Sequence, residues 1–235
     1  MIQTTPETSP TSAATRHTVF IVDDHPLVRE WLGNLIARQP DLAVCGQAGS
    51  SATAYEAISK LQPDIAVVDL SLEDGSGLEL IKQLQVMAEP PRVLVLSMHD
   101  EVFYAERALR AGASGYIMKR AATGHVIEAI RQVMSGKIYI SEPLAVQMAE
   151  KFVNKNPSGG SPVALLSDRE MEVFQMLGQG IETRRIAETL HLSPKTVQVY
   201  CGRIKEKLGL ENATALIREA VRWHEQQQGT GHAAL

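Results

Sequence analysis

Apolar runs of four to seven residues alternate with amphipathic stretches from His17 to about Lys137. The runs are rich in β-branched residues, which predicts buried strands of a parallel sheet. The strand candidates are Thr18–Val22, Leu42–Ala48, Ile65–Asp69, Arg92–Ser97 and Gly115–Met118. Apolar residues at helical spacing predict helices over Pro26–Arg38, Ser51–Leu61, Gly77–Gln85, Glu101–Ala111 and Thr123–Ser135. Five strand–helix units predict a doubly wound α/β domain, with a five-stranded parallel sheet covered on both faces.

The pattern changes after this domain. One short helix is expected over Leu144–Phe152, followed by a linker rich in Asn, Gly, Ser and Pro. From Leu166 onward the periodicity is helical throughout, which predicts a small all-α domain. The helices are expected after Ser167, over Thr183–Leu190 and Pro194–Leu208, and from Asn212 through Glu225. The predicted boundaries are a disordered tail (1–16), the α/β domain (17–137), the linker (138–163), the all-α domain (164–228) and a second tail (229–235).

Charged side chains follow three of the predicted strands. Asp23 and Asp24 follow the first strand, Asp69 ends the third, and Lys119 follows the fifth. The carboxyl ends of parallel strands share one edge of a sheet, and ligands bind there. Three carboxylates held close together raise each other's pKa, and a hard divalent cation relieves the repulsion. Oxygen ligands favour Mg²⁺, so the sequence predicts a magnesium site at this edge.

The last domain carries a basic helix. Between Arg184 and Lys207 there are six basic and two acidic residues, a local balance of +4 in a chain whose net charge is −4. A tight turn before Pro194 joins two predicted helices, as in a helix-turn-helix. If Val197, Cys201, Ile204 and Leu208 face the core, the outward residues are candidate DNA contacts: Ser193, Lys195, Thr196, Gln198, Val199, Gly202, Arg203 and Lys207. The competing interpretation is a solvated basic face on a helical bundle.

Two further expectations concern the surroundings of the protein. No apolar stretch approaches the roughly 20 residues of a membrane span, and Met1–Thr15 lacks the apolar core of a secretory signal. We therefore expect a cytoplasmic protein.

The motifs of the all-α domain, including Leu166–Glu170, Leu192–Val197 and Lys207–Gly209, resemble the DNA-binding domain of LuxR-type regulators. Thr183 stands where that family usually has Asn, and Tyr200 where it usually has His. Asp23, Asp24, Asp69, Ser97, Tyr116 and Lys119 together resemble the receiver domain of two-component response regulators. With both domains in this order, the chain resembles a response regulator of the NarL/FixJ type.

The resemblance implies a flavodoxin-like receiver and a set of roles. Asp69 is expected to accept a phosphoryl group from a histidine kinase, while Asp23, Asp24, Asp69 and the Ser71 carbonyl hold Mg²⁺. Ser97 and Lys119 are expected to contact the phosphoryl group, and Tyr116 to change rotamer as the switch. It implies double-stranded DNA with paired half-sites as a partner, a homodimer once phosphorylated, and RNA polymerase as a further candidate partner. Ser71-Leu72 and Arg120 depart from the usual receiver pattern, which has Met-Pro and Pro at these places.

Three classes of function remain open at this point. The first is a phosphorylation-controlled transcription regulator with no catalytic residues of its own. The second is a Mg²⁺-dependent phosphohydrolase with an Asp nucleophile, but Ser71 stands where such enzymes place their general acid. The third is a DNA-binding regulator whose receiver has lost phosphorylation. For dimerisation, the last helix with Ala215, Leu216, Ala220 and Trp223 is one candidate surface; alternatively these residues only pack within the bundle.

Overall fold

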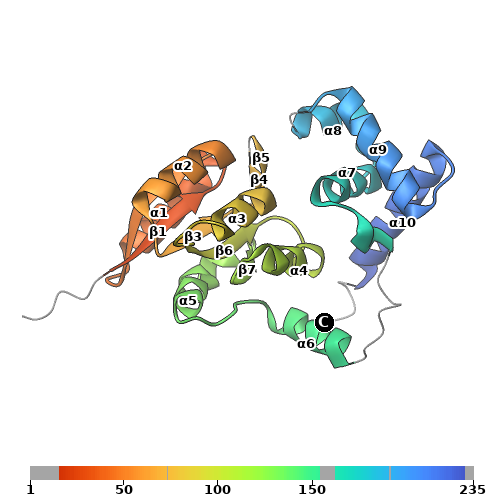
Figure 1. The fold of residues 1–235 in the computed structure, drawn as a ribbon. Helices are drawn as coiled ribbons and strands as arrows, with labels where there is room; N and C mark the ends of the chain where they lie inside the picture. The colour runs from red at the N-terminus through yellow and green to blue at the C-terminus, as the bar shows by residue number, and fades with distance from the viewer. Residues whose placement is uncertain (1–15, 73, 154–161, 191, 231–235) are drawn as a thin grey trace, which may run out of the picture.

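The computed structural model describes residues 16–72, 74–153, 162–190 and 192–230, and shows an α/β domain followed by a helical domain (Figure 1). The strands are β1 (His17–Val22), β2 (Leu42–Ala48), β3 (Ile65–Val68), β4 (Ser71–Leu72), β5 (Gly75–Ser76), β6 (Arg92–Ser97) and β7 (Gly115–Met118). The helices of the first domain are α1 (Pro26–Ala37), α2 (Ser51–Leu61), α3 (Gly77–Gln85), α4 (Glu101–Ala111) and α5 (Ala122–Met134). After them come α6 (Glu142–Val153), the 3₁₀ turn η2 (Pro162–Leu165), α7 (Asp168–Gly178), α8 (Thr183–Thr189), α9 (Pro194–Leu208) and α10 (Ala213–Thr230).

Most of the predicted tails (1–16 and 229–235) lies outside the described residues, as do residues 154–161 of the predicted linker (138–163). The last helix runs past its expected end at Glu225, to Thr230. Among the residues that are described, none of the helices has the length and apolar character needed to cross a bilayer.

The main sheet is five-stranded and parallel, with strand order β2-β1-β3-β6-β7. This confirms the predicted doubly wound arrangement, in which the strand order reverses beside β1. β1 pairs with β3 so that Val22 lies opposite Val68. The residues that follow these two strands are therefore neighbours at the carboxyl edge of the sheet.

Alternate residues of each strand serve opposite faces of the sheet. On β1, Val19 and Ile21 pack with α1 and α5, whereas Phe20 and Val22 belong to the core under α2, α3 and α4. Burial on both faces explains why these strands are apolar without polar alternation. The core that contains Phe20 and Val22 continues past α4 into the helical domain.

The short β4–β5 hairpin between β3 and α3 was not predicted. Its two-residue strands are too short to produce a periodic pattern. The hairpin brings Asp74 to the start of α2, where its carboxylate accepts hydrogen bonds from the backbone N–H groups of Ser51 (2.6 Å) and Ala52 (3.0 Å). Gly77 follows the hairpin at a close approach, since a Cβ there would lie 2.0 Å from the Asp69 carbonyl oxygen.

Capping residues fix the helices of the second domain. Ser167 and Glu170 form the predicted capping box at α7. The Ser193 hydroxyl accepts a hydrogen bond from the Thr196 N–H at the start of α9, and Gly209 ends that helix in the left-handed conformation. Asn212 caps α10 through a 2.9 Å bond from the Ala215 N–H. α7 packs against both α9 and α10, and α8 packs against α9.

Candidate functional site

The acidic residues meet at the carboxyl edge of the sheet because of the backbone pairing there. The Asp69 N–H donates to the Val22 carbonyl (2.8 Å), which places Asp69 beside the end of β1. The Lys119 N–H donates to the Ser97 carbonyl (2.8 Å), which ties the end of β7 to that of β6. Asp23 then lies across from Asp69, with Lys119 reaching both.

Lys119 forms the centre of this acidic site. Its Nζ lies 2.7 Å from Asp69 Oδ2 and 2.6 Å from Asp23 Oδ2. Both carboxylates are 3% exposed and the lysine side chain is 10% exposed. One ammonium therefore serves two buried carboxylates, and Asp24 adds a third close by.

The pKa values reflect this shortage of positive charge. Burial raises the pKa of Asp69 above its ordinary value; Lys119 opposes the rise, and the Asp23 carboxylate adds to it. Burial disfavours the charged form of Lys119, but Asp69 and Asp23 together outweigh that effect and keep the pKa of Lys119 above its ordinary value. The site thus has more negative charge than its lysine neutralises.

The donor set fits a hard divalent cation. Ligand atoms of Asp23, Asp24, His25 and Asp69 all lie within 4.8 Å of one another. Asp69 Oδ1 is buried and has no hydrogen-bond partner among the described residues. A buried carboxylate oxygen without a partner is costly unless something binds it. The residues of the cluster therefore fit Mg²⁺.

The side chains of Asp23 and Asp24 do not cap α1, although they come shortly before it. The N-cap of α1 is His25, without a side-chain cap bond. Asp23 Oδ1 instead accepts a hydrogen bond from the His25 N–H (2.9 Å), and His25 Nδ1 lies 2.5 Å from Asp24 Oδ1.

The remaining predicted residues of this region converge on a residue that sequence reasoning missed, His99. The Ser97 hydroxyl accepts a hydrogen bond from the His99 N–H (3.2 Å), and the Tyr116 hydroxyl donates to the His99 carbonyl (2.8 Å). The Ser71 hydroxyl lies 2.9 Å from His99 Nε2. Burial, with a smaller effect of the Lys119 charge, lowers the pKa of His99 to about 4. The imidazole is therefore neutral at pH 7. The sequence signal that could have identified His99 is its position just beyond β6, at the same edge of the sheet as the acidic residues.

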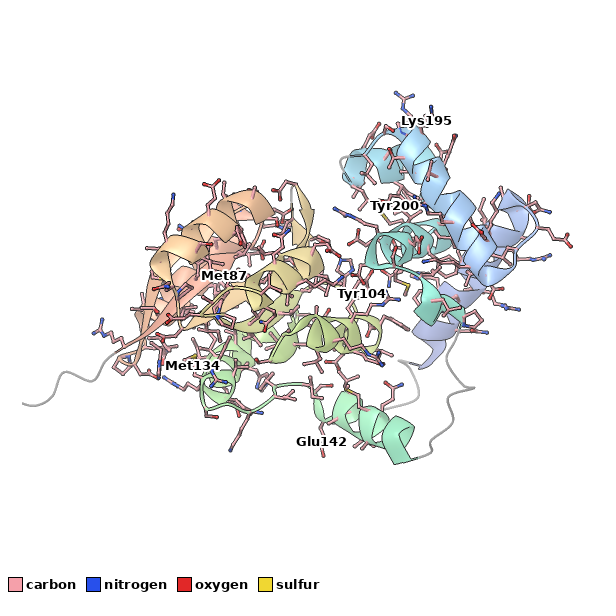
Figure 2. The ribbon with its side chains drawn as sticks, viewed as in Figure 1. Met87, Tyr104, Met134, Glu142, Lys195 and Tyr200 are labelled. Atoms are coloured by element: carbon pink, nitrogen blue, oxygen red, sulfur yellow. The ribbon has the colours of Figure 1, made fainter. Side chains whose placement is uncertain are left out.

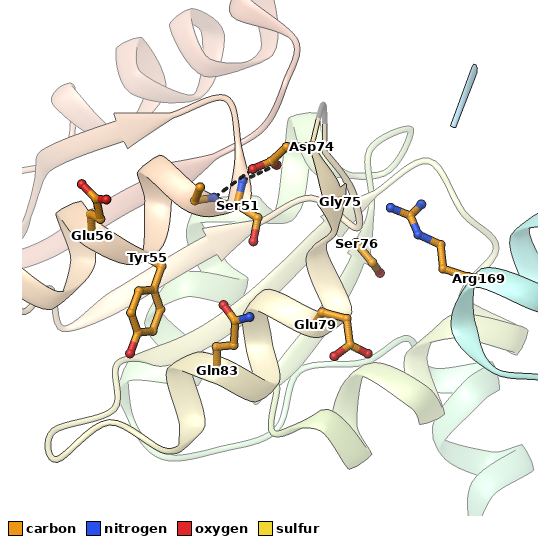
Figure 3. Close-up of a pocket in the computed structure, with 10 residues that line it drawn as sticks. Ser51, Tyr55, Glu56, Asp74, Gly75, Ser76, Glu79, Gln83 and Arg169 are labelled. Atoms are coloured by element: carbon orange, nitrogen blue, oxygen red, sulfur yellow. Dashed lines mark hydrogen bonds between the residues drawn. The ribbon is translucent and has the colours of Figure 1, made fainter. Parts of the chain in front are cut away.

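A cleft of about 530 Å³ lies between α2, the β4–β5 hairpin and α3. Figure 3 shows its lining residues, with Arg169 of α7 at one side. None of the predicted site residues lines it. One of the charged residues that line this cleft, Asp74, already has a structural role, because its carboxylate caps α2. We therefore place the functional site at the acidic cluster and not at this cleft.

The second predicted site is the outer face of α9. Lys195, Gln198, Val199, Gly202 and Arg203 are exposed on this helix, as is Ser193 at its N-cap; Thr196 is partly buried. Val197 and Ile204 face the core, whereas Cys201 and Leu208 are only partly buried. Figure 2 shows Lys195 at the upper end of α9, where its side chain projects outward from the ribbon. The exposure of its neighbours leaves this face of the helix open.

Two sets of candidate residues in this domain make contacts within the protein. Lys207 is not a free cation on the DNA-binding face, because its Nζ lies 2.6 Å from the buried Glu170 carboxylate and donates to the Leu165 carbonyl (3.2 Å). On α10, Leu216, Ala220 and Trp223 are buried. Trp223 packs against Phe174 of α7, as the packing interpretation expected, and also against Phe103 of α4.

Comparisons with known proteins agree with this geometry. Residues 19–131 match the response regulator receiver domain, and residues 164–220 match the luxR family of bacterial regulatory proteins. The transcriptional activator protein ExaE of Pseudomonas putida is 36% identical over 203 residues, which cover 86% of this chain and 95% of ExaE.

Solved structures show the same fold. A two-component response regulator of the LuxR family from Aurantimonas is 34% identical, with a TM-score of 0.55 over 59% of this chain and 99% of that one. A structure of two RcsB dimers bound to two parallel DNAs matches with 26% identity and a TM-score of 0.54, over 87% of this chain and 97% of that one. These relatives are regulators and not enzymes. The chain therefore belongs to the NarL/LuxR family of two-component response regulators, which bind DNA and regulate transcription.

Proposed function

We propose that Asp69 is the phosphoacceptor of this response regulator and that its phosphorylation controls DNA binding by α9. The proposal rests on the Asp69 carboxylate: its buried Oδ1 has no hydrogen-bond partner in the part of the chain that the structure describes, and its Oδ2 is held by Lys119. This arrangement leaves one oxygen of an oriented carboxylate available as a nucleophile.

The roles of the chain's own residues follow from the charges. In the transfer, the Asp69 oxygen forms a bond to phosphorus as the P–N bond of a phosphohistidine on the partner kinase breaks. The bonding electrons return to the kinase imidazole, which is then protonated. In this proposal Lys119 stabilises the negative charge of the phosphoryl oxygens, and the Ser97 hydroxyl bonds one of them.

Asp23, Asp24, Asp69 and the Ser71 carbonyl are the groups that we propose hold Mg²⁺. When bound, the ion supplies charge neutralisation between these carboxylates and the incoming phosphoryl group. Tyr116 is proposed as the switch residue. Its ring is buried and its hydroxyl binds the His99 carbonyl, so a change of rotamer would alter the loop that follows β6.

For DNA, we propose that the N-terminal half of α9 enters the major groove. Lys195 and the backbone N–H groups near Ser193 and Thr196 suit a phosphate. We propose that Gln198 and Val199 contact base edges, with Gly202 and Arg203 beside them on the same exposed face. Lys207, whose ammonium is paired with Glu170, is a further proposed contact toward the C-terminal end of α9.

One such module makes few base contacts, so we propose that the phosphorylated protein binds paired half-sites as a homodimer. The RcsB dimers on DNA support this arrangement. The proposed partners are a cognate histidine kinase, double-stranded DNA and RNA polymerase, and the proposed location is the cytoplasm.

The phosphoacceptor is tested by treating the protein with a small acyl phosphate in Mg²⁺ or in EDTA, followed by peptide mass mapping. We expect Mg²⁺-dependent modification at Asp69 and none in Asp69→Asn. Asp41→Asn, a change at a surface aspartate outside the cluster, should be modified like the wild type. Modification that persists in Asp69→Asn, or that never occurs, would contradict the proposal.

A further inference from the structure

The receiver and the DNA-binding domain are docked on each other through α4. Arg107 of α4 donates to the Leu166 carbonyl (2.8 Å) and to the Asp168 carboxylate (3.1 Å). Phe103 lies against Trp223 of α10, with ring centroids 4.7 Å apart. α4 thus holds α7 and α10 and leaves the DNA-binding face of α9 open. Any control of DNA binding by this docking must act through the placement of the domain and not by covering α9.

Tyr104 occupies the middle of this interface (Figure 2). Its side chain is fully buried, and its hydroxyl donates to Gln175 Oε1 of α7 (3.0 Å). On the receiver side its ring stacks on the His99 imidazole, with centroids 4.5 Å apart and an angle of 28° between the planes. One side chain therefore contacts both the DNA-binding domain and the loop after β6.

His99 in turn contacts three of the residues predicted to act with Asp69. Its backbone N–H, its carbonyl and its Nε2 contact Ser97, Tyr116 and Ser71 respectively. These are three of the residues that the proposed function assigns to the phosphoryl group, the switch and the metal. A displacement of any of them displaces the imidazole on which Tyr104 stacks.

We propose that His99 and Tyr104 are positioning residues that couple the state of the Asp69 site to the docking of the DNA-binding domain on α4. The inference rests on the proposed role of Asp69. Phosphorylation shifts Ser97 and Tyr116, His99 follows, and the bond from Tyr104 to Gln175 is weakened. Because coupling between two sites is reciprocal, loosening the docked domain must favour phosphorylation of Asp69 by the same factor.

The test uses the full chain and two matched variants at the interface. Tyr104→Phe keeps the ring on His99 and removes the hydroxyl, and Gln175→Leu removes the acceptor in the other domain. Arg110→Ala, an exposed position of α4, is the control. In a Trp31→Phe background, Trp223 is the only tryptophan, and its fluorescence reports docking because Phe103 covers it.

We expect both variants to expose Trp223 and to raise the equilibrium fraction of Asp69 phosphorylated by a small acyl phosphate, by roughly two- to tenfold in the phosphorylation equilibrium constant. Arg110→Ala should change neither. A purely structural contact in α7 would not alter chemistry at Asp69. Unchanged phosphorylation in variants that expose Trp223, or unchanged Trp223 in both variants, would overturn the coupling. Failure of the wild-type protein to be modified at Asp69 would instead refute the proposed function, while the Trp223 signal would still report the docking contact.

Discussion

Replacing Lys119 with methionine tests the charge balance of the acidic site directly. The change keeps most of the length of the side chain but removes the one ammonium that, among the described residues, contacts both Asp23 and Asp69, which are nearly inaccessible to solvent. Removing one partner of a buried ion pair costs about 3–5 kcal/mol, because a charge is left uncompensated. For a domain of this size such a loss lowers the melting temperature by on the order of 10–20 °C.

The expected loss depends on Mg²⁺ and on pH. Mg²⁺ at about 100 times its dissociation constant adds roughly 2.7 kcal/mol, so it should recover much of the deficit in Lys119→Met. The pKa of Asp69, already raised by burial, should rise further without the lysine. When the pKa of a carboxyl is higher in the folded than in the unfolded protein, the protein loses stability as pH rises through the folded-state pKa. The deficit should therefore be larger at pH 8 than at pH 5.

Thermal unfolding with EDTA or Mg²⁺, at these two pH values, measures both effects. Lys137→Met, a change at an exposed lysine, is the matched control and should stay within about 0.5 kcal/mol of the wild type. A melting temperature of Lys119→Met equal to that of the wild type in EDTA at pH 8 would refute the view that Lys119 compensates buried carboxylates.

Three other changes test separate parts of the structure. Gly77→Ala would place a methyl group 2.0 Å from the Asp69 carbonyl oxygen, so we expect slower phosphorylation in the mass-mapping assay; a wild-type rate would show that the close approach relaxes freely. Burial raises the pKa of Glu172 in α7, against the opposing effect of Arg169, so its charge destabilises the fold above pH 4.5. Glu172→Gln should then melt higher than the wild type at pH 7, with the difference shrinking toward pH 4; a lower melting temperature at pH 7 would contradict this. Lys195→Ala should weaken binding to all DNA sequences and reduce its salt dependence, whereas Gln198→Ala should relax preference at one base pair by about 1–3 kcal/mol. An unchanged preference would remove Gln198 from the base-reading set.

The sequence was informative wherever one local signal decided the structure. The bounds of α3, α4 and α9 agree with the prediction. For α4 and α9 the end signals are visible in the sequence, since Gly112 and Gly209 stop them. The acidic site could be located because parallel strands bring their carboxyl ends to one edge, so Asp23, Asp69 and Lys119 had to meet.

The contacts that sequence reasoning missed depend on the placement of whole elements. Lys207 was expected to face DNA like the other basic residues of α9, but Glu170 lies within its reach once α7 and α9 pack together. Arg107 and Tyr104 have the pattern of ordinary helix residues, and only the docking of the second domain shows their partners. His99 is likewise identified by the three residues that converge on it in space.

The central claim is that phosphorylation of Asp69 changes DNA binding. The most direct measurement is the affinity of the full chain for DNA with paired half-sites, at fixed salt, with and without a small acyl phosphate and Mg²⁺. Coupling between two sites of a protein is typically worth about 1–3 kcal/mol, or roughly 5- to 150-fold in affinity. We predict an increase in this range for the wild type and none for Asp69→Asn. Equal affinity of the wild-type protein with Asp69 phosphorylated and unphosphorylated would contradict the account.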